Sequence, residues 1–411
     1  MFEFGLKSGL GSGREPSPAA LIAILSATSV LGMLGISSFA ALLPEFQSLW
    51  HLDNTDAGWI GSLYLAGYVA AVPVLVGSTD HTDPRRIYLF SLVVGGLASA
   101  GYALFAQGFW SASFFRFFTG LGLAGTYMPG LKLLTDRVTG KLQNRYVAYY
   151  TAGFSLAIAI SYGFTGEVAD FLGWEAAFWG VTLGSVLSFA LIYFLVPPRA
   201  PGAAPVEGWL KRFDFRPVFK NRAVMAFVLG YAGHIFELFA LRAWMVAYLI
   251  YADRLRGGAG DISMANWIAT AAALVGTVAS IYGAEVAARA DRRKMISRVM
   301  VCSFLAAIFA GFSAGLPVWI VAALCCLYNM IVMGDSAALT NGAVVSSPAS
   351  QRGATLAVHS LIGFAGGTVG PLAVGVVLDA AGGGADHLAW GLGFITMGLG
   401  SLTALLAIRK L

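Results

Sequence analysis

The sequence has little charge. Asp, Glu, Lys and Arg make up only 11% of its 411 residues, whereas a soluble globular protein carries about 25%. This scarcity excludes a surface surrounded by water, and together with 13% aromatic residues it also excludes intrinsic disorder. Hydrophobic residues make up 58% of the chain, and the mean hydropathy is +0.74. Because a hydrocarbon core needs roughly 20 apolar residues per helix, we expect a membrane protein with many spans.

Cysteine and the common catalytic motifs are also scarce. The three cysteines, Cys302, Cys325 and Cys326, fall inside apolar runs and have neither disulfide nor metal-site spacing. The chain contains no HExxH motif, nucleophile elbow or P-loop. The segment from Gly120 to Gly125 matches G-x-G-x-x-G, but it lies in an apolar run without a preceding strand, which indicates helix packing. We therefore predict no enzyme activity, no cofactor and no bound metal.

Twelve apolar runs, separated by charged or turn residues, predict twelve transmembrane helices in two sets of six. The runs are 20–43, 57–78, 87–107, 110–134, 147–168, 176–196, 223–250, 265–287, 295–313, 316–345, 354–379 and 388–408. The predicted fold is therefore all-α, with two pseudo-symmetric six-helix bundles. We expect a cytoplasmic tail at 1–17, an N-terminal bundle at 18–196, a cytoplasmic linker at 197–222 and a C-terminal bundle at 223–411.

The basic residues predict the orientation of the chain. Of the 26 Lys and Arg residues, 21 fall on one side of the predicted membrane, which the positive-inside rule assigns to the cytoplasm. Both termini are then cytoplasmic, and we expect a multi-pass protein of the cell inner membrane. The basic charge follows from this topology and does not indicate nucleic acid binding. In the linker, Trp209, Leu210 and Phe213 share a helical face, which fits a short amphipathic helix at the lipid headgroups; a plain tether fits equally well.

Two motifs and a weak repeat resemble a known family. At an offset of 207 residues, Arg85-Arg86 maps onto Arg292-Arg293 and Arg145 onto Arg352. The loop Gly77-Ser-Thr-Asp80-His81-Thr-Asp83-Pro-Arg85-Arg86 resembles the G-x-x-x-D-R-x-G-R-R loop of the major facilitator superfamily, although His81 and Asp83-Pro84 depart from that pattern. The segment from Arg116 to Gly122 resembles the R-x-x-x-G-x-G motif of the same family.

This resemblance implies a transporter with alternating access, in which spans 1, 4, 7 and 10 line a central cavity between the two halves. It also implies that the loop after span 2 is a cytoplasmic latch of charges. We expect this gate to consist of Asp80, Arg85 and Arg86, with Glu285 and Arg289 opposite. The alternative is that these arginines only fix the topology.

Ionisable residues inside the predicted membrane give the sharpest functional signal, because each costs about 2.5 kcal/mol or more in hydrocarbon. Seven such residues occur, and six of them lie on spans 4, 7 and 10: Arg116, Lys132, His234, Glu237, Arg242 and Asp335, with His359 on span 11. We expect Arg116, His234, Glu237, Arg242 and Asp335 to bind substrate or protons. Tyr127, Lys132, Tyr231 and His359 are candidate cavity residues.

The excess of buried cations favours an anionic substrate, since arginine binds carboxylates with two hydrogen bonds. We therefore predict a proton-coupled secondary transporter of a small organic anion that works as a monomer in the lipid bilayer. Three alternatives stay open. The charges could form fixed ion pairs, such as Glu237 with Arg116. The protein could export a drug, a siderophore-like molecule or a metal ion. It could also be a transporter-like sensor or a membrane-embedded enzyme.

Overall fold

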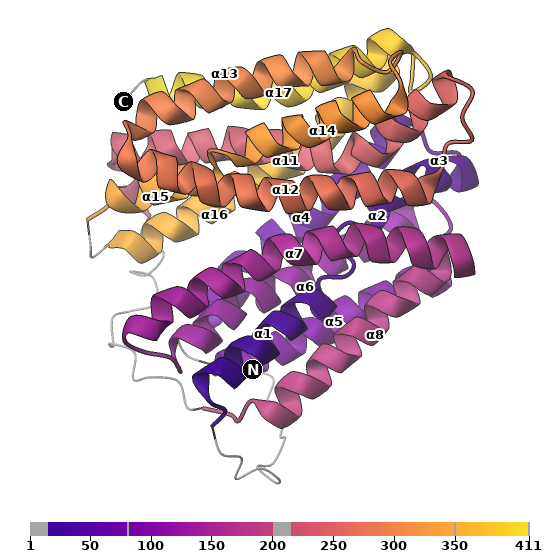
Figure 1. The fold of residues 1–411 in the computed structure, drawn as a ribbon. Coiled ribbons are helices and arrows are strands. Elements are labelled where there is room, and N and C mark those ends of the chain that lie inside the picture. The colour runs from indigo at the N-terminus through magenta and orange to yellow at the C-terminus, as the bar shows by residue number, and fades with distance from the viewer. Residues whose placement is uncertain (1–14, 80–81, 200–214, 349–350, 410–411) are drawn as a thin grey trace.

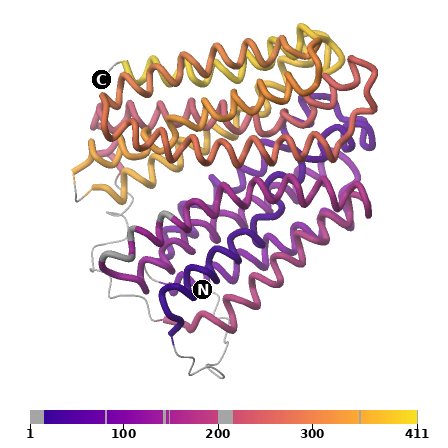
Figure 2. The backbone as a smooth tube through the Cα atoms, viewed as in Figure 1, coloured from indigo at the N-terminus to yellow at the C-terminus, as the bar shows by residue number. Residues whose placement is uncertain are grey.

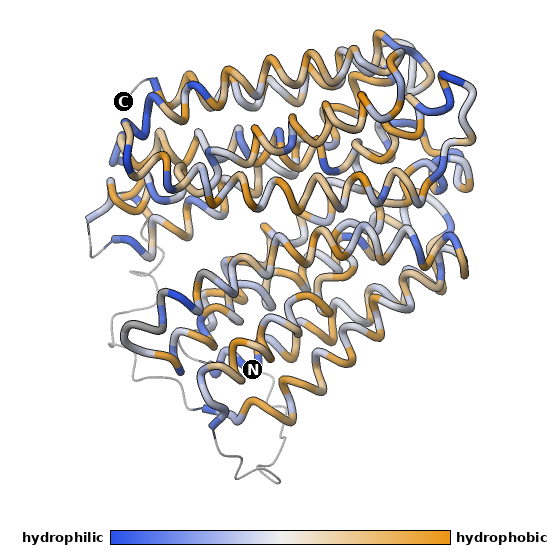
Figure 3. The backbone as a smooth tube through the Cα atoms, viewed as in Figure 1, coloured by the Kyte–Doolittle hydropathy of each residue, from blue (hydrophilic) through white to orange (hydrophobic). Residues whose placement is uncertain are grey.

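The computed structural model describes residues 15–79, 82–199, 215–348 and 351–409. All regular secondary structure in these segments is helical, and ten helical stretches, one of them the segment Val318–Val345 that contains two helices, are long and apolar enough to cross a membrane. Apolar positions dominate the length of the helices, and hydrophilic positions gather near their ends (Figure 3). The predicted all-α membrane fold is therefore confirmed. The predicted amphipathic segment around Trp209, Leu210 and Phe213 lies outside the described residues.

The helices pack as two groups (Figure 1). The first group contains α1 (Pro18–Gly32), α2 (Ser38–Ala41), α3 (Leu43–Trp50), α4 (Asn54–Ser78), α5 (Pro84–Phe105), α6 (Phe109–Thr135), α7 (Lys141–Leu172) and α8 (Trp174–Leu195). The second contains α10 (Arg216–Lys220), α11 (Arg222–Leu255), α12 (Ile262–Arg289), α13 (Arg292–Gly311), α14 (Val318–Met333), α15 (Ser336–Val345), α16 (Arg352–Ala380) and α17 (His387–Arg409).

Aspartate caps explain where several of the spans begin. Asp53, Asp261 and Asp291 each precede a helix, and each side chain accepts a hydrogen bond from a backbone amide of the first turn. An N-cap acceptor satisfies one of the amides that have no partner within the helix. At Asp291, which lies between two spans, the hydrogen bond from the Lys294 amide lowers the pKa of the carboxyl group.

Glycine allows α4 and α6 to pack with their backbones close together. A Cβ atom on Gly120 would lie 1.7 Å from the carbonyl oxygen of Tyr64, and one on Gly67 would lie 1.9 Å from that of Phe117. No side chain fits at these distances, so glycine is required at both positions. The glycine repeat that begins at Gly120 thus serves helix packing, as its sequence context predicted.

Two of the predicted spans are broken in the middle. The first run is divided between α1, α2 and α3, and the run 316–345 is divided between α14 and α15 at Gly334 and Asp335. A break exposes backbone carbonyls that need partners inside a membrane. Side chains supply them: Ser161 Oγ donates to the carbonyl of Leu34 at 2.5 Å, and Arg116 Nη1 donates to that of Gly35 at 3.0 Å.

The two groups meet at one end of the molecule and diverge toward the other (Figures 1 and 2). We name the closed end, which holds Asn54 and Asp379, the Asp379 end, and we name the opposite end, which holds Arg85 and Arg292, the basic end. Among the described residues, every side-chain hydrogen bond between the groups lies in the half of the helices nearer the Asp379 end.

Candidate functional site

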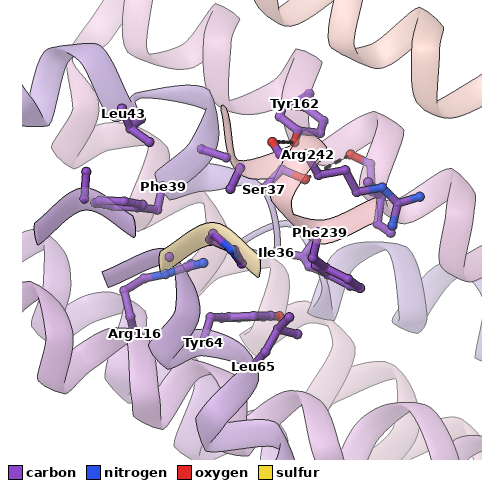
Figure 4. A pocket seen from close by; sticks show the side chains of 16 residues that line it. Ile36, Ser37, Phe39, Leu43, Tyr64, Leu65, Arg116, Tyr162, Phe239 and Arg242 are labelled. Atoms are coloured by element: carbon purple, nitrogen blue, oxygen red, sulfur yellow. Dashed lines mark hydrogen bonds between the residues drawn. The ribbon is translucent and has the colours of Figure 1, made fainter. Parts of the chain in front are cut away.

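A cavity lies between the two groups of helices, next to the break in the first span (Figure 4). Residues of the break in the first span and of α2, α3, α4, α6 and α7 line it from the first group, and residues of α11 and α16 line it from the second. Its volume is about 50 Å³. The walls are largely apolar, and Arg116 and Arg242 are the only charged residues among those that line the cavity. The apolar side chains include Ile36, Phe39, Leu43, Leu65 and Phe239, and the uncharged polar ones are Ser37, Tyr64 and Tyr162.

Arg116 is fixed in one geometry. Its side chain is 4% exposed, and its guanidinium carbon lies 4.4 Å from the centroid of the Tyr64 ring. The centroid of the Phe39 ring lies 5.9 Å from the same guanidinium carbon. Arg116 also donates the hydrogen bond to the Gly35 carbonyl described above. Within the described part of the chain, Nε has no hydrogen-bond partner and the guanidinium has no carboxylate partner. Arg116 is therefore a preorganised positive charge at the cavity wall.

Arg242 reaches the same cavity from the other group and is less constrained. Nη2 lies 3.8 Å from the sulfur of Met333, and the guanidinium carbon lies 5.6 Å from the centroid of the Phe239 ring. Its Nε also has no hydrogen-bond partner among the described residues, and no described carboxylate pairs with it. Arg116, which is buried, and Arg242, which is partly buried, thus line one cavity from different groups of helices, without a countercharge that the structure describes.

His234 and Asp335 lie side by side within the second group. His234 Nδ1 is 2.9 Å from Asp335 Oδ1, and each residue is 2% exposed. Asp335 occupies the break between α14 and α15, where its side chain caps no amide. The two side chains are not aligned for a hydrogen bond, because Asp335 Oδ1 has no hydrogen-bond partner in the described segments. His234 Nε2, on the other side of the ring, has none either. The contact is compact and buried.

An aromatic stack extends from this pair to α16. The Tyr231 ring lies 5.7 Å from the His234 ring and 4.0 Å from the His359 ring, with small interplanar angles. His359 Nε2 lies 3.1 Å from Thr340 Oγ1. Tyr231 and His359, both candidate cavity residues, therefore belong to the His234 cluster and do not line the cavity of Arg116 and Arg242.

Glu237 lies elsewhere. Its carboxylate accepts hydrogen bonds from the hydroxyls of Ser303 and Tyr328, both at 2.8 Å, and from Ser401. These partners lie on α13, α14 and α17, so Glu237 faces the interior of the second group and not the cavity. The alternative of an ion pair between Glu237 and Arg116 is not formed, because hydroxyl donors surround the carboxylate. Its role in proton binding stays a prediction.

Two further candidate cavity residues also lie away from the cavity. Lys132 forms an ion pair of 3.3 Å with Asp136 near the basic end, where both side chains are about one third exposed. Such an exposed pair on one helix contributes little to stability. Tyr127 packs its ring 5.8 Å from that of Tyr150 and 4.6 Å from that of Phe154, within the first group.

The predicted latch residues do not bridge the two groups in the described segments. Arg85 donates a hydrogen bond of 2.7 Å to the carbonyl of Tyr193, within the first group. Glu285 pairs with Arg289 on the same exposed helix face, and Arg86 is exposed. Asp80 lies outside the described residues. Their function as a gate therefore stays a prediction.

Sequence reasoning missed that Asp83 binds the backbone amides of Arg85 and Arg199 in this region. Asp83 is 4% exposed, and its two oxygens accept hydrogen bonds from the amides of Arg85 at 3.0 Å and Arg199 at 2.9 Å. The aspartate fixes the start of α5 and ties it to the end of α8. An aspartate before Pro84 is a common start signal of a helix, so the cap was recognisable from the sequence. The contact with Arg199 was not recognisable, because the two residues lie 116 positions apart in the chain.

Sequence reasoning also missed two carboxylates at the Asp379 end, Asp379 on α16 and Glu167 on α7. Both accept hydrogen bonds from the other group of helices. Each lies at the end of an apolar run, where a charge is common and gives no signal of its own.

Comparison with known proteins decides the family. The family model described as Major Facilitator Superfamily matches residues 25–343. The chain belongs to the major facilitator superfamily. This confirms the resemblance that the loop after span 2 and the start of span 4 predicted, and it makes the protein a membrane transporter rather than an enzyme.

Curated relatives within the superfamily include spinster proteins. The chain is 27% identical over 236 residues to the probable sphingolipid transporter spinster homolog 2 of Arabidopsis thaliana, which covers 52% of this chain and 48% of the relative. It is 22% identical over 366 residues to protein spinster homolog 1 of Bos taurus, covering 82% of this chain and 67% of the relative. The match with the first relative thus spans about half of that protein's length.

Solved structures of the superfamily share the whole fold. A bacterial homologue of the human lysosomal transporter Spinster, in an inward-facing and unoccupied conformation, matches with a TM-score of 0.78 at 15% identity, covering 97% of this chain and 98% of that chain. The nucleoside transporter NupG, as a D323A mutant, matches with a TM-score of 0.74 at 16% identity, covering 95% of this chain and 99% of that chain. The two six-helix bundles predicted from the sequence are therefore the superfamily fold.

Proposed function

We propose that this transporter binds an organic anion between Arg116 and Arg242 and moves it by alternating access. One observation carries the proposal: Arg116, which is buried, and Arg242, which is partly buried, come from different groups of helices and line the same cavity, and neither has a carboxylate partner in the described segments. An uncompensated charge in a membrane interior is costly, and this cavity is lined by two of them. An anion that enters the cavity offsets both costs and joins the two halves of the protein.

The walls of the cavity indicate the rest of the substrate. Phe39, Leu65 and Phe239 give the arginines apolar surroundings, which suit an acid group attached to an apolar body. The spinster relative named as a probable sphingolipid transporter supports an amphiphilic substrate, although the match covers about half of that protein. Export of a metal ion gains no support, because the described residues contain no cluster of three or more His, Cys, Asp or Glu side chains suited to a metal.

The pair of His234 and Asp335 is the proposed proton site. A buried carboxylate and an imidazole 2.9 Å apart form a unit whose charge changes with one proton. A net charge on that unit has to be offset inside the membrane, so its protonation and the occupancy of the nearby cavity influence each other. Asp335 is better placed for this role than Glu237, because three hydroxyl donors hold Glu237 within the second group.

The conformation is proposed to face the cytoplasm. The two groups are closed at the Asp379 end and diverge toward the basic end (Figure 1), which the positive-inside rule places in the cytoplasm. The likeness to a solved structure in an inward-facing conformation supports this assignment. A cytoplasmic latch that includes Arg85 and Glu285 would hold the basic end closed, so the lack of a contact between these two residues in the described segments fits a conformation open at that end.

Binding of a matched set of small molecules tests the proposed function. Hexanesulfonate, hexanol and hexylamine share a chain and differ in charge, and the sulfonate stays anionic at every pH used. We expect hexanesulfonate alone to raise the Tm of the purified protein, and Arg116→Gln or Arg242→Gln to abolish the shift. Arg254→Gln, an exposed arginine at the Asp379 end, is the control and should keep it. An equal shift with hexylamine, or a shift that survives in both cavity variants, would contradict the proposal.

A further inference from the structure

We propose that Asp379 and Glu167 form two equivalent latches that hold the Asp379 end of the transporter closed. Each carboxylate belongs to one group of helices and accepts hydrogen bonds from the other group. The inference rests on the alternating access proposed above, and it adds a pair of residues that control the equilibrium between the two conformations.

Asp379 makes the more extensive contact. Its Oδ1 accepts hydrogen bonds from the backbone amide of Asn54 at 3.1 Å and from Asn54 Nδ2 at 2.6 Å. Its Oδ2 accepts from the backbone amide of Thr55 at 2.7 Å and from Thr55 Oγ1 at 2.6 Å. The carboxylate thus receives four donors from the first two residues of α4. Two of the donors are amides at a helix N-terminus, where negative charge is favourable.

The contact of Asp379 is not needed to cap α4. Asp53 already fills that role, because its side chain accepts from the amide of Asp56 at 2.7 Å. Asp379 instead comes from the last turn of α16, 324 residues further along the chain from Thr55. Its four hydrogen bonds therefore connect the two groups and are lost when the groups separate.

Glu167 makes the corresponding contact from the first group. Its Oε1 accepts hydrogen bonds from Ser263 Oγ and from Trp267 Nε1, both at 2.6 Å. Ser263 and Trp267 lie in the first two turns of α12. This helix also has a cap of its own, since Asp261 accepts from the amide of Met264 at 3.0 Å. Glu167, like Asp379, is an added connection between the groups.

The two contacts occupy equivalent places in the two halves. Counting membrane crossings, α7 and α16 are the fifth of each half, and α4 and α12 are the second. In both cases a carboxylate near the end of the fifth crossing binds the start of the second crossing of the other half. The repeat offset of 207 residues would map Glu167 to position 374, five residues before Asp379, so the same contact is built from different positions. Charge-assisted hydrogen bonds are the stronger kind, and both sets have to break for this end to open.

Accessibility of the cavity from the Asp379 side tests the proposal. Ala243 lines the cavity, so Ala243→Cys in a background with Cys302, Cys325 and Cys326 changed to Ser reports access to it. A membrane-impermeant maleimide is added to right-side-out vesicles. We expect Asp379→Asn and Glu167→Gln each to increase the labelling rate several-fold, and the double variant to increase it by at least tenfold. Asp170→Asn, an exposed carboxylate on the same turn of α7 as Glu167, is the control and should change nothing. Labelling of the double variant at the control rate would overturn the proposal.

A disulfide cross-link at the latch tests the same proposal without relying on Asp379→Asn or Glu167→Gln, which could reduce labelling differences by folding poorly. Thr55→Cys with Asp379→Cys, added to the Ala243→Cys reporter, places two thiols at the latch. We expect oxidation to lower maleimide labelling of the reporter thiol from the outside to background and a reductant to restore it. Cross-linked protein that labels as fast as reduced protein would contradict the latch. Neither measurement uses a substrate. The result for the latch is therefore independent of the hexanesulfonate result that tests the anion site.

Discussion

The Tyr162 hydroxyl donates a hydrogen bond of 2.5 Å to the carbonyl oxygen of Arg242, from one group of helices to the other. Arg242 therefore has two contacts of different kinds, because its backbone holds the groups together while its guanidinium faces the cavity. In the proposed mechanism, movement of α11 toward an anion and separation of α7 from α11 both act on Arg242. In that mechanism, occupancy of the site is connected with the closure of the Asp379 end.

Removal of the Tyr162 hydroxyl should loosen that closure without removing the anion site. A buried hydrogen bond contributes about 1 kcal/mol, so we expect Tyr162→Phe to raise the maleimide labelling of the Ala243→Cys reporter about fivefold while the Tm shift with hexanesulfonate persists. Phe154→Leu, which alters a ring on the same helix that packs against Tyr127, serves as the comparison. Unchanged labelling in Tyr162→Phe would show that this bond does not contribute to closure.

Arg116 should depend on the shape of its guanidinium as well as its charge. The planar group bonds to the Gly35 carbonyl and lies over the Tyr64 ring, and lysine reproduces neither contact well. We predict that Arg116→Lys weakens the binding of hexanesulfonate about tenfold, less than Arg116→Gln, in titrations followed by calorimetry. Equal affinities for the lysine variant and the unmodified protein would mean that charge alone matters.

Asp335 and Glu237 should behave differently when each is changed to its amide. We predict that hexanesulfonate moves protons into proteoliposomes, as followed by an internal pH dye, and that Asp335→Asn abolishes this movement while exchange of labelled hexanesulfonate continues. Loss of exchange together with coupling would assign Asp335 to substrate binding alone. Proton movement that persists in Asp335→Asn would show that Asp335 does not bind the coupled proton.

Glu237→Gln is compared with Asp335→Asn in the same proteoliposome assay of proton movement. The amide keeps the size of the side chain but replaces a charged acceptor of the hydroxyls of Ser303, Tyr328 and Ser401. We expect proton coupling to persist, and stability to fall by about 1–3 kcal/mol, the usual cost of disturbing a buried hydrogen-bonded charge. Coupling abolished in a variant of normal Tm would place the proton on Glu237 instead.

Much of the fold could be predicted because it depends on local chemistry. Each span is an apolar run long enough to cross a hydrocarbon core, and lysine and arginine collect in the loops of one side. The breaks at Gly35 and Asp335 could not be predicted in this way, since hydropathy does not record backbone hydrogen bonding. The break at Gly35 is stable because Arg116 and Ser161, far along the chain, bind the freed carbonyls.

The site was predictable to the extent that burial of charge is costly. Arg116 and Arg242 were recognisable because each interrupts an apolar run, and their convergence on one cavity follows the arrangement that the family resemblance implied. The orientation of a side chain around its helix was not recognisable. His234 and Glu237 are three residues apart on α11, yet His234 lies against Asp335 while Glu237 binds α13, α14 and α17. Asp379 and Glu167 depend on contacts between the halves, which no local pattern records.

A crystal structure with 6-bromohexanesulfonate bound would test the central claim most directly, because the anomalous signal of bromine locates the ligand without ambiguity. We predict that the sulfonate lies between the guanidinium groups of Arg116 and Arg242, with the bromine against the apolar wall near Phe239 and Leu65. A ligand bound elsewhere, with the two arginines contacting only water, would contradict the account.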